Sequence, residues 1–292
     1  VDFSRAFDVI NHNVIERKLV ENKSPAVLSN WLLSFLNNRT QFVRIGDKIS
    51  ESVVVNAGAP QGTRAGPNCF KLLISDLTFS IPFVKYVDDV SVLSISHDFN
   101  DDSLQRALCD LHSWCDLNGM HLNTKKTKEM ILKFSKRVRS DLCDSLVYDN
   151  ALIDRVDEFK ILGVIMSSDL TWSRHIEYIL ARANKRIFAI CQLVRCGFDH
   201  NDIVTVYCSL IRPVLEYASQ VWHSGLTKTQ SDEIERVQRR CLHIIYPQLS
   251  YSDARAVSGL QLLSVRRENA VIKLSNEIKN PSHPMSFIIF YL

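Results

Sequence analysis

The amino-acid sequence predicts an α+β region followed by an all-helical region. Between residues 41 and 166, short runs of β-branched and aromatic residues are interleaved with segments of helical periodicity, whereas only the helical period remains after Trp172. Strands and helices do not alternate as regular βαβ units, which favours α+β over a doubly wound sheet. With 292 residues, 46% of them hydrophobic, the chain can form one large core or two domains.

The first elements follow from local periodicity and turn residues. "VDF" is interpreted as the end of a strand, and residues 12–37 predict helix that is broken near Ser24-Pro25. Residues 41–56 predict a hairpin that turns at Gly46-Asp47. The glycine- and proline-rich stretch 58–67 predicts a loop, and residues 68–78 predict a helix after it.

The remaining elements are predicted in the same way. Residues 99–118 form an amphipathic pattern that ends at Asn118-Gly119, and "KEMILKF" predicts a strand. Residues 146–166 predict further strands with a turn at Asp149-Asn150. The boundary between the two regions is predicted near residues 167–169. The helical patterns beyond it cover residues 172–195, 200–224, 228–246 and 262–279.

Two adjacent aspartates interrupt the apolar stretch "PFVKYVDDVSVLSI", residues 82–95. Its two arms predict a tight hairpin with Asp88 and Asp89 at the tip. Two-residue hairpins prefer Asn-Gly or Asp-Gly, and two adjacent carboxylates repel each other unless a cation neutralises them. A simple turn and a metal site both remain open on this evidence.

A third carboxylate, Asp2, stands at the predicted end of the first strand. If that strand neighbours the Asp88-Asp89 hairpin, three carboxylates form an oxygen-rich site suited to Mg²⁺. Two Mg²⁺ ions held about 3.5–4 Å apart can activate an attacking hydroxyl and stabilise a leaving phosphate oxygen. This pattern therefore indicates phosphoryl transfer, in which positioning and charge neutralisation supply most of the catalysis.

Composition narrows the class of protein further. The eight cysteines include no C-x-x-C pair, which favours free thiols in a reducing compartment over disulfides or a zinc site. No signal peptide opens the chain, and no apolar run approaches the length that spans a membrane. We therefore expect an intracellular protein of nucleus or cytoplasm, neither secreted nor membrane-bound. The net charge is +3, with the positive excess after residue 160.

Five ordered segments carry a family resemblance: "VDFSRAFDVINH", "GAPQGTRAGP", "YVDD", "MHLNTKKTKEMI" and "FKILGVIM". They resemble motifs A to E of the reverse transcriptase palm of non-LTR (LINE-type) retrotransposons. The segment "LIRPVLEYASQVWHSG…IERVQRRCLHIIY" resembles the helical region that follows the palm in that family. The resemblance implies a palm with an antiparallel sheet and packed helices over residues 1–168. It also implies a helical thumb-like region over 169–280 and a tail over 281–292.

The implied activity is RNA-directed DNA polymerisation, in which two Mg²⁺ ions assist the addition of dNTPs to a DNA primer on an RNA template. Asp2 and Asp88 would be the principal metal-binding carboxylates, with Asp89 as the third acidic member. Lys126 would be a general acid toward pyrophosphate, and Lys128 is the competing candidate. A solvated basic run is the alternative interpretation of these lysines.

The resemblance also implies a nucleotide-binding set. Phe3 would offer its backbone near the triphosphate, and Phe7 would be the steric gate against the ribose 2′-hydroxyl group. Gln61 and Gly62 would contact the incoming nucleotide or the template, because glycine permits close backbone approach. The alternatives are a core role for Phe7 and a simple helix-entry turn at Gln61-Gly62.

A primer grip is implied at Leu162-Gly163, although strand packing alone would also explain this pair. Basic stripes on two predicted helices suit contact with a nucleic-acid backbone, with a solvated surface as the alternative. The residues of these stripes are Arg182, Lys185 and Arg186 on the first helix and Arg236, Arg239, Arg240 and His243 on the second.

The sequence departs from the family pattern in motif B, at Thr63, Arg64, Ala65 and Asn68. It also starts inside motif A, whereas family members carry fingers and usually an endonuclease upstream. We therefore expect the rest of a retrotransposon polyprotein as a partner and expect the chain alone not to be a competent polymerase. Two alternatives remain: a domesticated or decayed palm that binds nucleic acid without catalysis, and an RNA-dependent RNA polymerase. Phe7 and "YVDD" argue against the latter.

Overall fold

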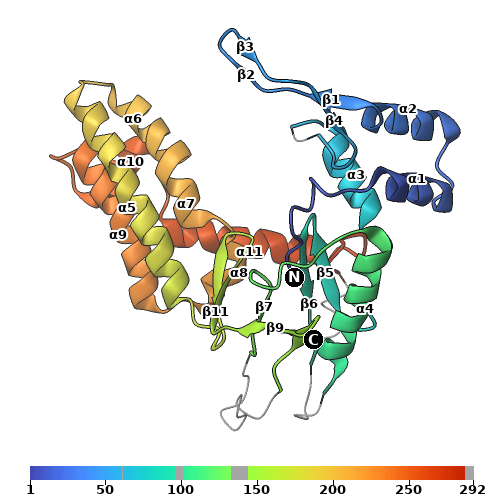
Figure 1. The fold of residues 1–292 in the computed structure, drawn as a ribbon. Helices are drawn as coiled ribbons and strands as arrows, with labels where there is room; N and C mark the ends of the chain where they lie inside the picture. The colour runs from blue at the N-terminus through green and yellow to red at the C-terminus, as the bar shows by residue number, and fades with distance from the viewer. Residues whose placement is uncertain (61, 96–100, 133–143, 287–292) are drawn as a thin grey trace. The chain divides into compact units, whose positions relative to one another are not determined.

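The computed structural model describes residues 1–60, 62–95, 101–132 and 144–286. The chain divides into two compact units that separate between Val156 and Asp157, apart from Leu132, which groups with the second. A mixed α/β region with small sheets is followed by an all-helical region, as predicted (Figure 1). The hairpin after Val156 belongs to the second unit, so the domain boundary at residue 168 stays a prediction.

The described helices of the first unit are α1 (His12–Glu21), α2 (Ala26–Leu36), α3 (Ala65–Leu73) and α4 (Ser103–Asn118). The predicted break near Ser24-Pro25 is confirmed, and α4 ends as predicted at Gly119, whose φ is 64°. Helix α3 begins and ends earlier than the predicted 68–78. Thr63 Oγ1 accepts the Gly66 N–H group at 3.2 Å, which satisfies a free donor of the first turn.

The described strands of the first unit pair in short ladders. β1 (Arg39–Gln41) pairs with β4 (Val53–Val55), β2 (Arg44–Ile45) with β3 (Lys48–Ile49), and β8 (Val147–Tyr148) with β9 (Ala151–Leu152). The turns at Gly46-Asp47 and Asp149-Asn150 are confirmed. β7 (Lys128–Glu129) pairs in parallel with β10 (Asp154–Arg155), so the described ladders do not form one antiparallel sheet.

The hairpin that carries the two aspartates corrects one prediction. β5 (Phe83–Tyr86) pairs with β6 (Asp89–Val92), and Tyr86 stands opposite Asp89. The two-residue turn is therefore Val87-Asp88, and Asp89 is the first residue of a strand. Val87 takes the positive φ of 55° that such a turn requires, an unfavourable conformation for a β-branched residue.

A single apolar core holds the first unit together. Fully buried residues from α1, α2, α3 and α4 meet there, together with residues of the segment before α1: Ile10, Ile15, Leu36, Phe70, Leu73 and Leu111. Burial of each such side chain contributes about 1.5–3 kcal/mol. This core supports the segment 1–10 on which Asp2, Phe3 and Phe7 lie.

The second unit begins with the hairpin of β11 (Glu158–Ile161) and β12 (Val164–Ser167). The helices that follow are α5 (Ser173–Arg195), α6 (His200–Val206), a π-helix (Tyr207–Ile211), α7 (Arg212–Glu216), α8 (Ser219–Trp222), a 3₁₀ turn (His223–Gly225), α9 (Lys228–Ile245), α10 (Tyr251–Ser258) and α11 (Leu263–Ile278). The predicted helix 200–224 is thus several shorter pieces. Ala218, with a φ of 52°, separates α7 from α8.

Helix α10 was not predicted, although its ends carry recognisable signals. The Ser250 hydroxyl caps its start by accepting the Asp253 N–H group at 3.2 Å, and Gly259 ends it with a φ of 66°. Its eight residues are too few to show a clear helical period. A short helix of this kind is therefore easily overlooked in sequence.

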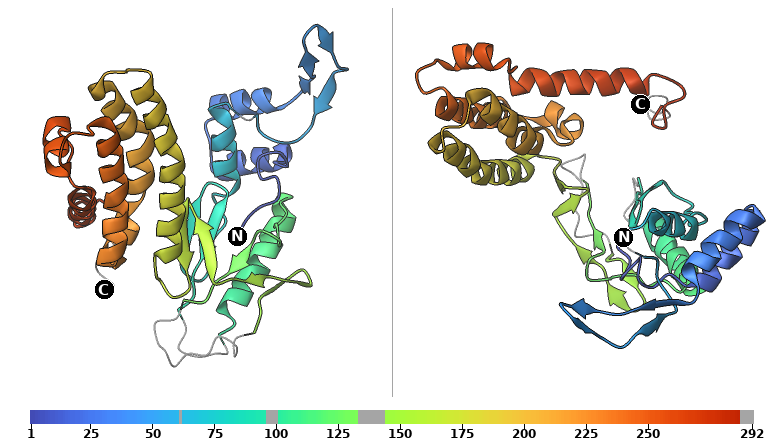
Figure 2. Two further views of the ribbon diagram at one scale, coloured as in Figure 1. Left: turned by 90° about the vertical axis from the view of Figure 1, so that its left-hand side faces the viewer. Right: turned by 90° about the horizontal axis from the view of Figure 1, so that it is seen from above.

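Helices α5 and α9 pack side by side, as Figures 1 and 2 show. Their facing positions are aliphatic and buried, including Ile179, Ile187, Ile234 and Val237. Burial raises the pKa of the Cys241 thiol in this core to about 12. Among the described residues, no helix has both the length and the apolar character needed to cross a membrane.

Candidate active site and nucleic-acid interface

The backbone around Asp2 is held by the segment that precedes β7. The Asp2 N–H group donates to Thr127 Oγ1 at 3.1 Å, and the Asn123 N–H group donates to the Asp2 carbonyl at 2.8 Å. The Val90 N–H group donates to the Val1 carbonyl at 3.4 Å. Three segments far apart in sequence therefore converge at Asp2, one of them the hairpin that carries Asp88 and Asp89.

Two of the predicted carboxylates act on the third, Asp89. Partial burial is the largest cause that raises the pKa of Asp89, followed by the charges of Asp88 and Asp2. The positive N-terminal amino group opposes these effects. No group of three or more His, Cys, Asp or Glu side chains within the described part of the chain is arranged to hold a metal ion.

The two candidate lysines of the general acid have different surroundings. Lys126 Nζ lies 4.0 Å from Asp2 Oδ1, and its side chain is 69% exposed. Lys128 Nζ lies 2.6 Å from Asp154 Oδ2, and its side chain is only 21% exposed. Lys128 thus pairs across the β7–β10 ladder, whereas Lys126 lies beside a predicted metal ligand, which favours Lys126.

Phe3 belongs to the first unit's core, and Phe7 packs against that core. The Phe3 backbone forms a bridge to Leu122, and its ring is buried 6.0 Å from Trp114. Phe7 is half-buried and packs on Phe70 of α3, with ring centroids 4.9 Å apart. Phe7 therefore contacts the helix that follows the glycine-rich loop, in agreement with both the gate and the core interpretations.

The glycine-rich loop is tied directly to the segment that carries Phe7. The Ala59 N–H group donates to the Phe7 carbonyl at 2.8 Å. A Cβ atom at Gly58, whose φ is 85°, would lie 2.8 Å from the Asp8 carbonyl oxygen, so this close approach requires glycine. Gly62 is exposed with a φ of 77° and open space around it, while Gln61 lies outside the described residues.

The predicted primer grip is the turn between β11 and β12. Leu162 and Gly163 have φ values of 46° and 90°, because Ile161 pairs with Val164 and leaves a two-residue turn. The Tyr217 hydroxyl donates to the Leu162 carbonyl at 2.8 Å. The turn is therefore attached to the end of α7.

The basic stripe of α5 is not uniform. Arg182 and Lys185 are exposed, and Arg182 lies over the Tyr178 ring, 5.4 Å from its centroid. Arg186 is half-buried and donates to the Leu210 carbonyl in the π-helix. That contact stabilises the second unit, so any further role of Arg186 in nucleic-acid contact stays a prediction.

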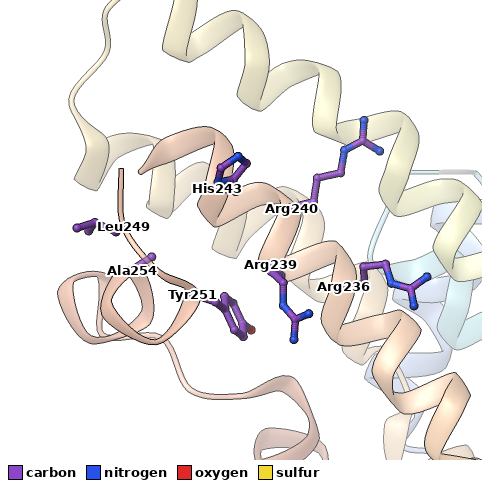
Figure 3. A pocket seen from close by; sticks show the side chains of 7 residues that line it. All are labelled: Arg236, Arg239, Arg240, His243, Leu249, Tyr251 and Ala254. Atoms are coloured by element: carbon purple, nitrogen blue, oxygen red, sulfur yellow. The ribbon is translucent and has the colours of Figure 1, made fainter. Parts of the chain in front are cut away.

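The basic stripe of α9 lines a hollow of about 340 Å³ (Figure 3). Its lining residues are Arg236, Arg239, Arg240, His243, Leu249, Tyr251 and Ala254. None of the three arginines forms an ion pair with a carboxylate of a residue that the structure describes. We call this surface the basic hollow; its uncompensated positive charge suits a phosphate-bearing ligand.

One wall of the basic hollow is preorganised. The Arg239 guanidinium group lies 5.1 Å from the Tyr251 ring centroid. The Tyr251 hydroxyl donates to the buried carboxylate of Glu235. Gln238 Nε2 donates to the Tyr251 oxygen at 2.9 Å. The two hydrogen bonds fix the Tyr251 ring, and the ring in turn holds Arg239 through a cation–π interaction.

Sequence reasoning missed several of these residues. Tyr217, Tyr251 and Thr127 each act through hydrogen bonds to partners distant in sequence, and hydrophobic periodicity does not predict such contacts. Tyr251 does follow the helix-capping Ser250, which was an available signal for α10. The contact partners themselves could not be read from sequence.

Comparison with known proteins matches this fold and site to one class. The family model described as "Reverse transcriptase (RNA-dependent DNA polymerase)" matches residues 1–166, which contain all three predicted carboxylates. The chain therefore belongs to the reverse transcriptase family. The predicted resemblance to retrotransposon enzymes is confirmed as well, because the chain is a distant homologue of polymerases from such elements.

Three relatives illustrate the relationship. The probable RNA-directed DNA polymerase from transposon BS of Drosophila melanogaster is 25% identical over 84% of this chain and 28% of its own length. The RNA-directed DNA polymerase from mobile element jockey of the same species is 26% identical over 96% of this chain and 31% of its own length. The retrovirus-related Pol polyprotein from type-1 retrotransposable element R2 of Popillia japonica is 25% identical over 99% of this chain and 43% of its own length. The chain thus spans less than half of each relative.

Proposed function

We propose that this chain supplies the palm and thumb-like region of an RNA-directed DNA polymerase that copies a retrotransposon RNA. The observation that carries the proposal is the junction of the Asp2 segment with the Asp88-Asp89 hairpin, where the Val90 N–H group donates to the Val1 carbonyl. Burial and then the charges of Asp88 and Asp2 raise the pKa of Asp89 there. Carboxylate crowding of this kind is stabilised by divalent cations.

The donor atoms are of the type that Mg²⁺ prefers, carboxylate oxygens, although the three described side chains are not grouped around one ion position. Asp2, Asp88 and Asp89 would hold two ions, with Asp2 and Asp88 as the principal ligands. When bound, the ions would lower the barrier to attack by the primer 3′-hydroxyl group on a dNTP. The chain's own contribution is to hold Asp2 through Thr127 and Asn123 and to place Asp88 in the strained turn.

The residues around this site have proposed roles toward the nucleotide. Lys126 protonates pyrophosphate as it leaves, because it is exposed beside Asp2 and free of the pairing that occupies Lys128. Phe7 restricts space at the sugar, while Phe3, Gln61 and Gly62 contribute to nucleotide or template contact. Phe70 supports the Phe7 ring from α3.

The helical region would contact the nucleic acid. The turn Leu162-Gly163 is the proposed primer grip. The stripe of α5 and the basic hollow of α9 are proposed to contact phosphates through the residues Arg182, Lys185, Arg186, Arg236, Arg239 and Arg240. The partners are an RNA template, a DNA primer and dNTPs inside the cell, together with further parts of a retrotransposon polyprotein.

The experiment is single-turnover primer extension, with the purified chain in excess over a labelled RNA–DNA primer–template and Mg²⁺ present. Binding of Mn²⁺, followed by water proton relaxation, forms a second arm. We expect slow extension at most, metal binding in the low millimolar range or tighter, and loss of both in Asp88→Ala. Asp47→Ala is the matched control, because Asp47 is an exposed turn aspartate of another hairpin in the same unit.

Metal binding that is unchanged in Asp88→Ala would contradict the catalytic proposal. Salt-dependent binding of primer–template without any metal binding would favour a domesticated or decayed palm instead. That alternative keeps the arginine surfaces and needs no carboxylate cluster.

A further inference from the structure

Three side chains of the helical part of the second unit hold the hairpin β11–β12, one at each strand and one at the turn. Lys160 Nζ on β11 donates to the Tyr178 hydroxyl at 2.7 Å. The Ile165 N–H group on β12 donates to His175 Nδ1 at 3.2 Å. The Tyr217 hydroxyl holds the turn itself through the Leu162 carbonyl, at 2.8 Å. Two contacts therefore hold the strands, and one holds the tip.

The contact between Tyr217 and the turn depends on the residues of both partners. A Cβ atom at Gly163 would lie 3.1 Å from Tyr217 Cε1, so any larger residue there would displace the ring by a few tenths of an ångström. The positive φ values of both turn residues place the Leu162 carbonyl toward the phenol. The Leu162 side chain remains 43% exposed. The tip thus has a fixed backbone and an accessible outer face.

Tyr217 is itself held firmly despite its exposed ring. Trp222 Nε1 donates to the Tyr217 carbonyl at 3.0 Å, and Trp222 is fully buried. Ala218 follows with the left-handed φ of 52° that turns the chain from α7 into α8. The phenol therefore extends from a rigid corner of the helical unit rather than from a mobile loop.

We infer that Tyr217 is a positioning residue that fixes the Leu162-Gly163 turn against the primer end. The inference rests on the proposed function, since it assigns the turn to the primer backbone. Alignment errors near 1 Å can cost about 10²-fold in such reactions, so one hydrogen bond at the tip has a large effect on positioning. The arginine surfaces hold the duplex independently of this turn.

Hydrogen exchange on the chain without nucleic acid tests the structural half. Tyr217→Phe removes the hydroxyl group and keeps the ring. We expect peptides that cover the turn to exchange about fivefold faster, the effect of one ordinary hydrogen bond. Tyr246→Phe is the control, because it removes a hydroxyl from the same unit at a residue without a contact to the turn. Equal exchange in Tyr217→Phe and the unmodified chain would overturn the inference.

A primer–template with 2-aminopurine at the primer 3′ end tests the functional half. We expect Tyr217→Phe to lose most of the fluorescence change on binding while its affinity changes by less than about twofold, because the phosphate contacts remain. A merely structural role would lower affinity and thermal stability instead. An unchanged fluorescence signal would overturn the inference.

Failure of the proposed function gives a different result from failure of the inference. If the unmodified chain does not bind primer–template, the polymerase proposal fails, and the role of Tyr217 toward a primer fails with it. If it binds and reports the primer end equally well with and without the Tyr217 hydroxyl, only the role of Tyr217 is rejected.

Discussion

The rings of Phe7 and Phe70 pack with their centroids 4.9 Å apart and their planes inclined by 32°. This contact joins the segment that carries Asp2 to α3, the helix that follows the glycine-rich loop. The position of the proposed steric gate therefore depends on α3 as well as on its own backbone. Aromatic pairs of this kind contribute about 0.5–1.5 kcal/mol beyond their buried area.

Phe7→Ala is expected to reduce the preference for deoxyribonucleotides by about tenfold or more, because a small side chain leaves room for the 2′-hydroxyl group. The measurement is the ratio of dissociation constants for dGTP and GTP in the presence of primer–template. Phe79→Ala, which removes another partly buried ring of the same unit, should keep the ratio. An unchanged ratio in Phe7→Ala would assign Phe7 to the core alone.

Asp89→Asn is expected to raise the melting temperature slightly in EDTA, by about 1–2 °C. The pKa of Asp89 is raised in the folded state. The free energy of unfolding therefore falls as the pH rises above the usual 3.8, and it stays lowered at all pH values above the raised pKa. Added Mg²⁺ should stabilise the unmodified chain more than the variant. Thermal unfolding with and without the cation measures both effects, and greater Mg²⁺ stabilisation of Asp89→Asn would contradict them.

Lys126→Gln should lower the extension rate, whereas Lys128→Gln should lower the stability of the fold. Lys126→Gln is expected to slow single-turnover extension by about 10²-fold with little change in stability, since general acids contribute about that much. Lys128→Gln loses its pairing with Asp154 and should cost up to about 1 kcal/mol of stability while extension persists. Urea unfolding and extension rates separate the two. A slower rate only in Lys128→Gln would reverse the assignment.

His175 should make the stability of the second unit depend on pH. Burial, and then the charge of Lys160, lower its pKa below the usual 6.5, and its Nδ1 accepts the Ile165 N–H group only while it is unprotonated. The unfolded chain therefore takes up a proton first, so the stabilisation is complete above pH 6.5 and is lost as the pH falls through the lowered pKa.

Urea unfolding between pH 7.5 and 5 measures this dependence, and His175→Gln should flatten it. His223 also has a pKa lowered by burial and by Arg267, so His223→Gln serves as the comparison. An equal slope in His175→Gln and the unmodified chain would show that His175 does not titrate in this way.

Replacing Arg236, Arg239 and Arg240 together with Gln should weaken binding of nucleic acid and reduce its salt dependence. Each lost phosphate contact lowers the slope of log K against log salt by about 0.7–0.9. Lys273→Gln is the control, because Lys273 lies 3.9 Å from Glu277 on α11, outside the basic hollow. Fluorescence anisotropy at several salt concentrations measures the slope, and an unaltered slope would assign the arginines to a solvated surface.

Local chemistry made much of the fold readable from sequence. The end of α4 at Gly119, the turns at Gly46-Asp47 and Asp149-Asn150, and the amphipathic faces of α5 and α9 each depend on residues a few positions apart. Backbone preference and hydrophobic periodicity act over that range, so these predictions were confirmed. The ordered motifs likewise indicated the reverse transcriptase family, which the family match confirms.

Relations between distant residues were decided by tertiary packing. The pairing of Tyr86 with Asp89 moved the turn by one residue, because strand register depends on the packing of both arms. The choice between Lys126 and Lys128 rests on Asp2 and Asp154, which lie far from both in sequence. Arg186 donates to the Leu210 carbonyl in the π-helix, and hydrophobic periodicity did not predict that π-helix.

The sequence by itself therefore determined most of the helices, two of the hairpin turns and the family, because these follow from residues close together in the chain or from ordered motifs. Only the tertiary structure decided that Asp2 acts on Asp89, that Lys128 and not Lys126 pairs across a strand ladder, and that Tyr217 holds the Leu162 carbonyl 55 residues away. Such contacts form only when packed cores bring remote segments together, and local propensity carries no information about them.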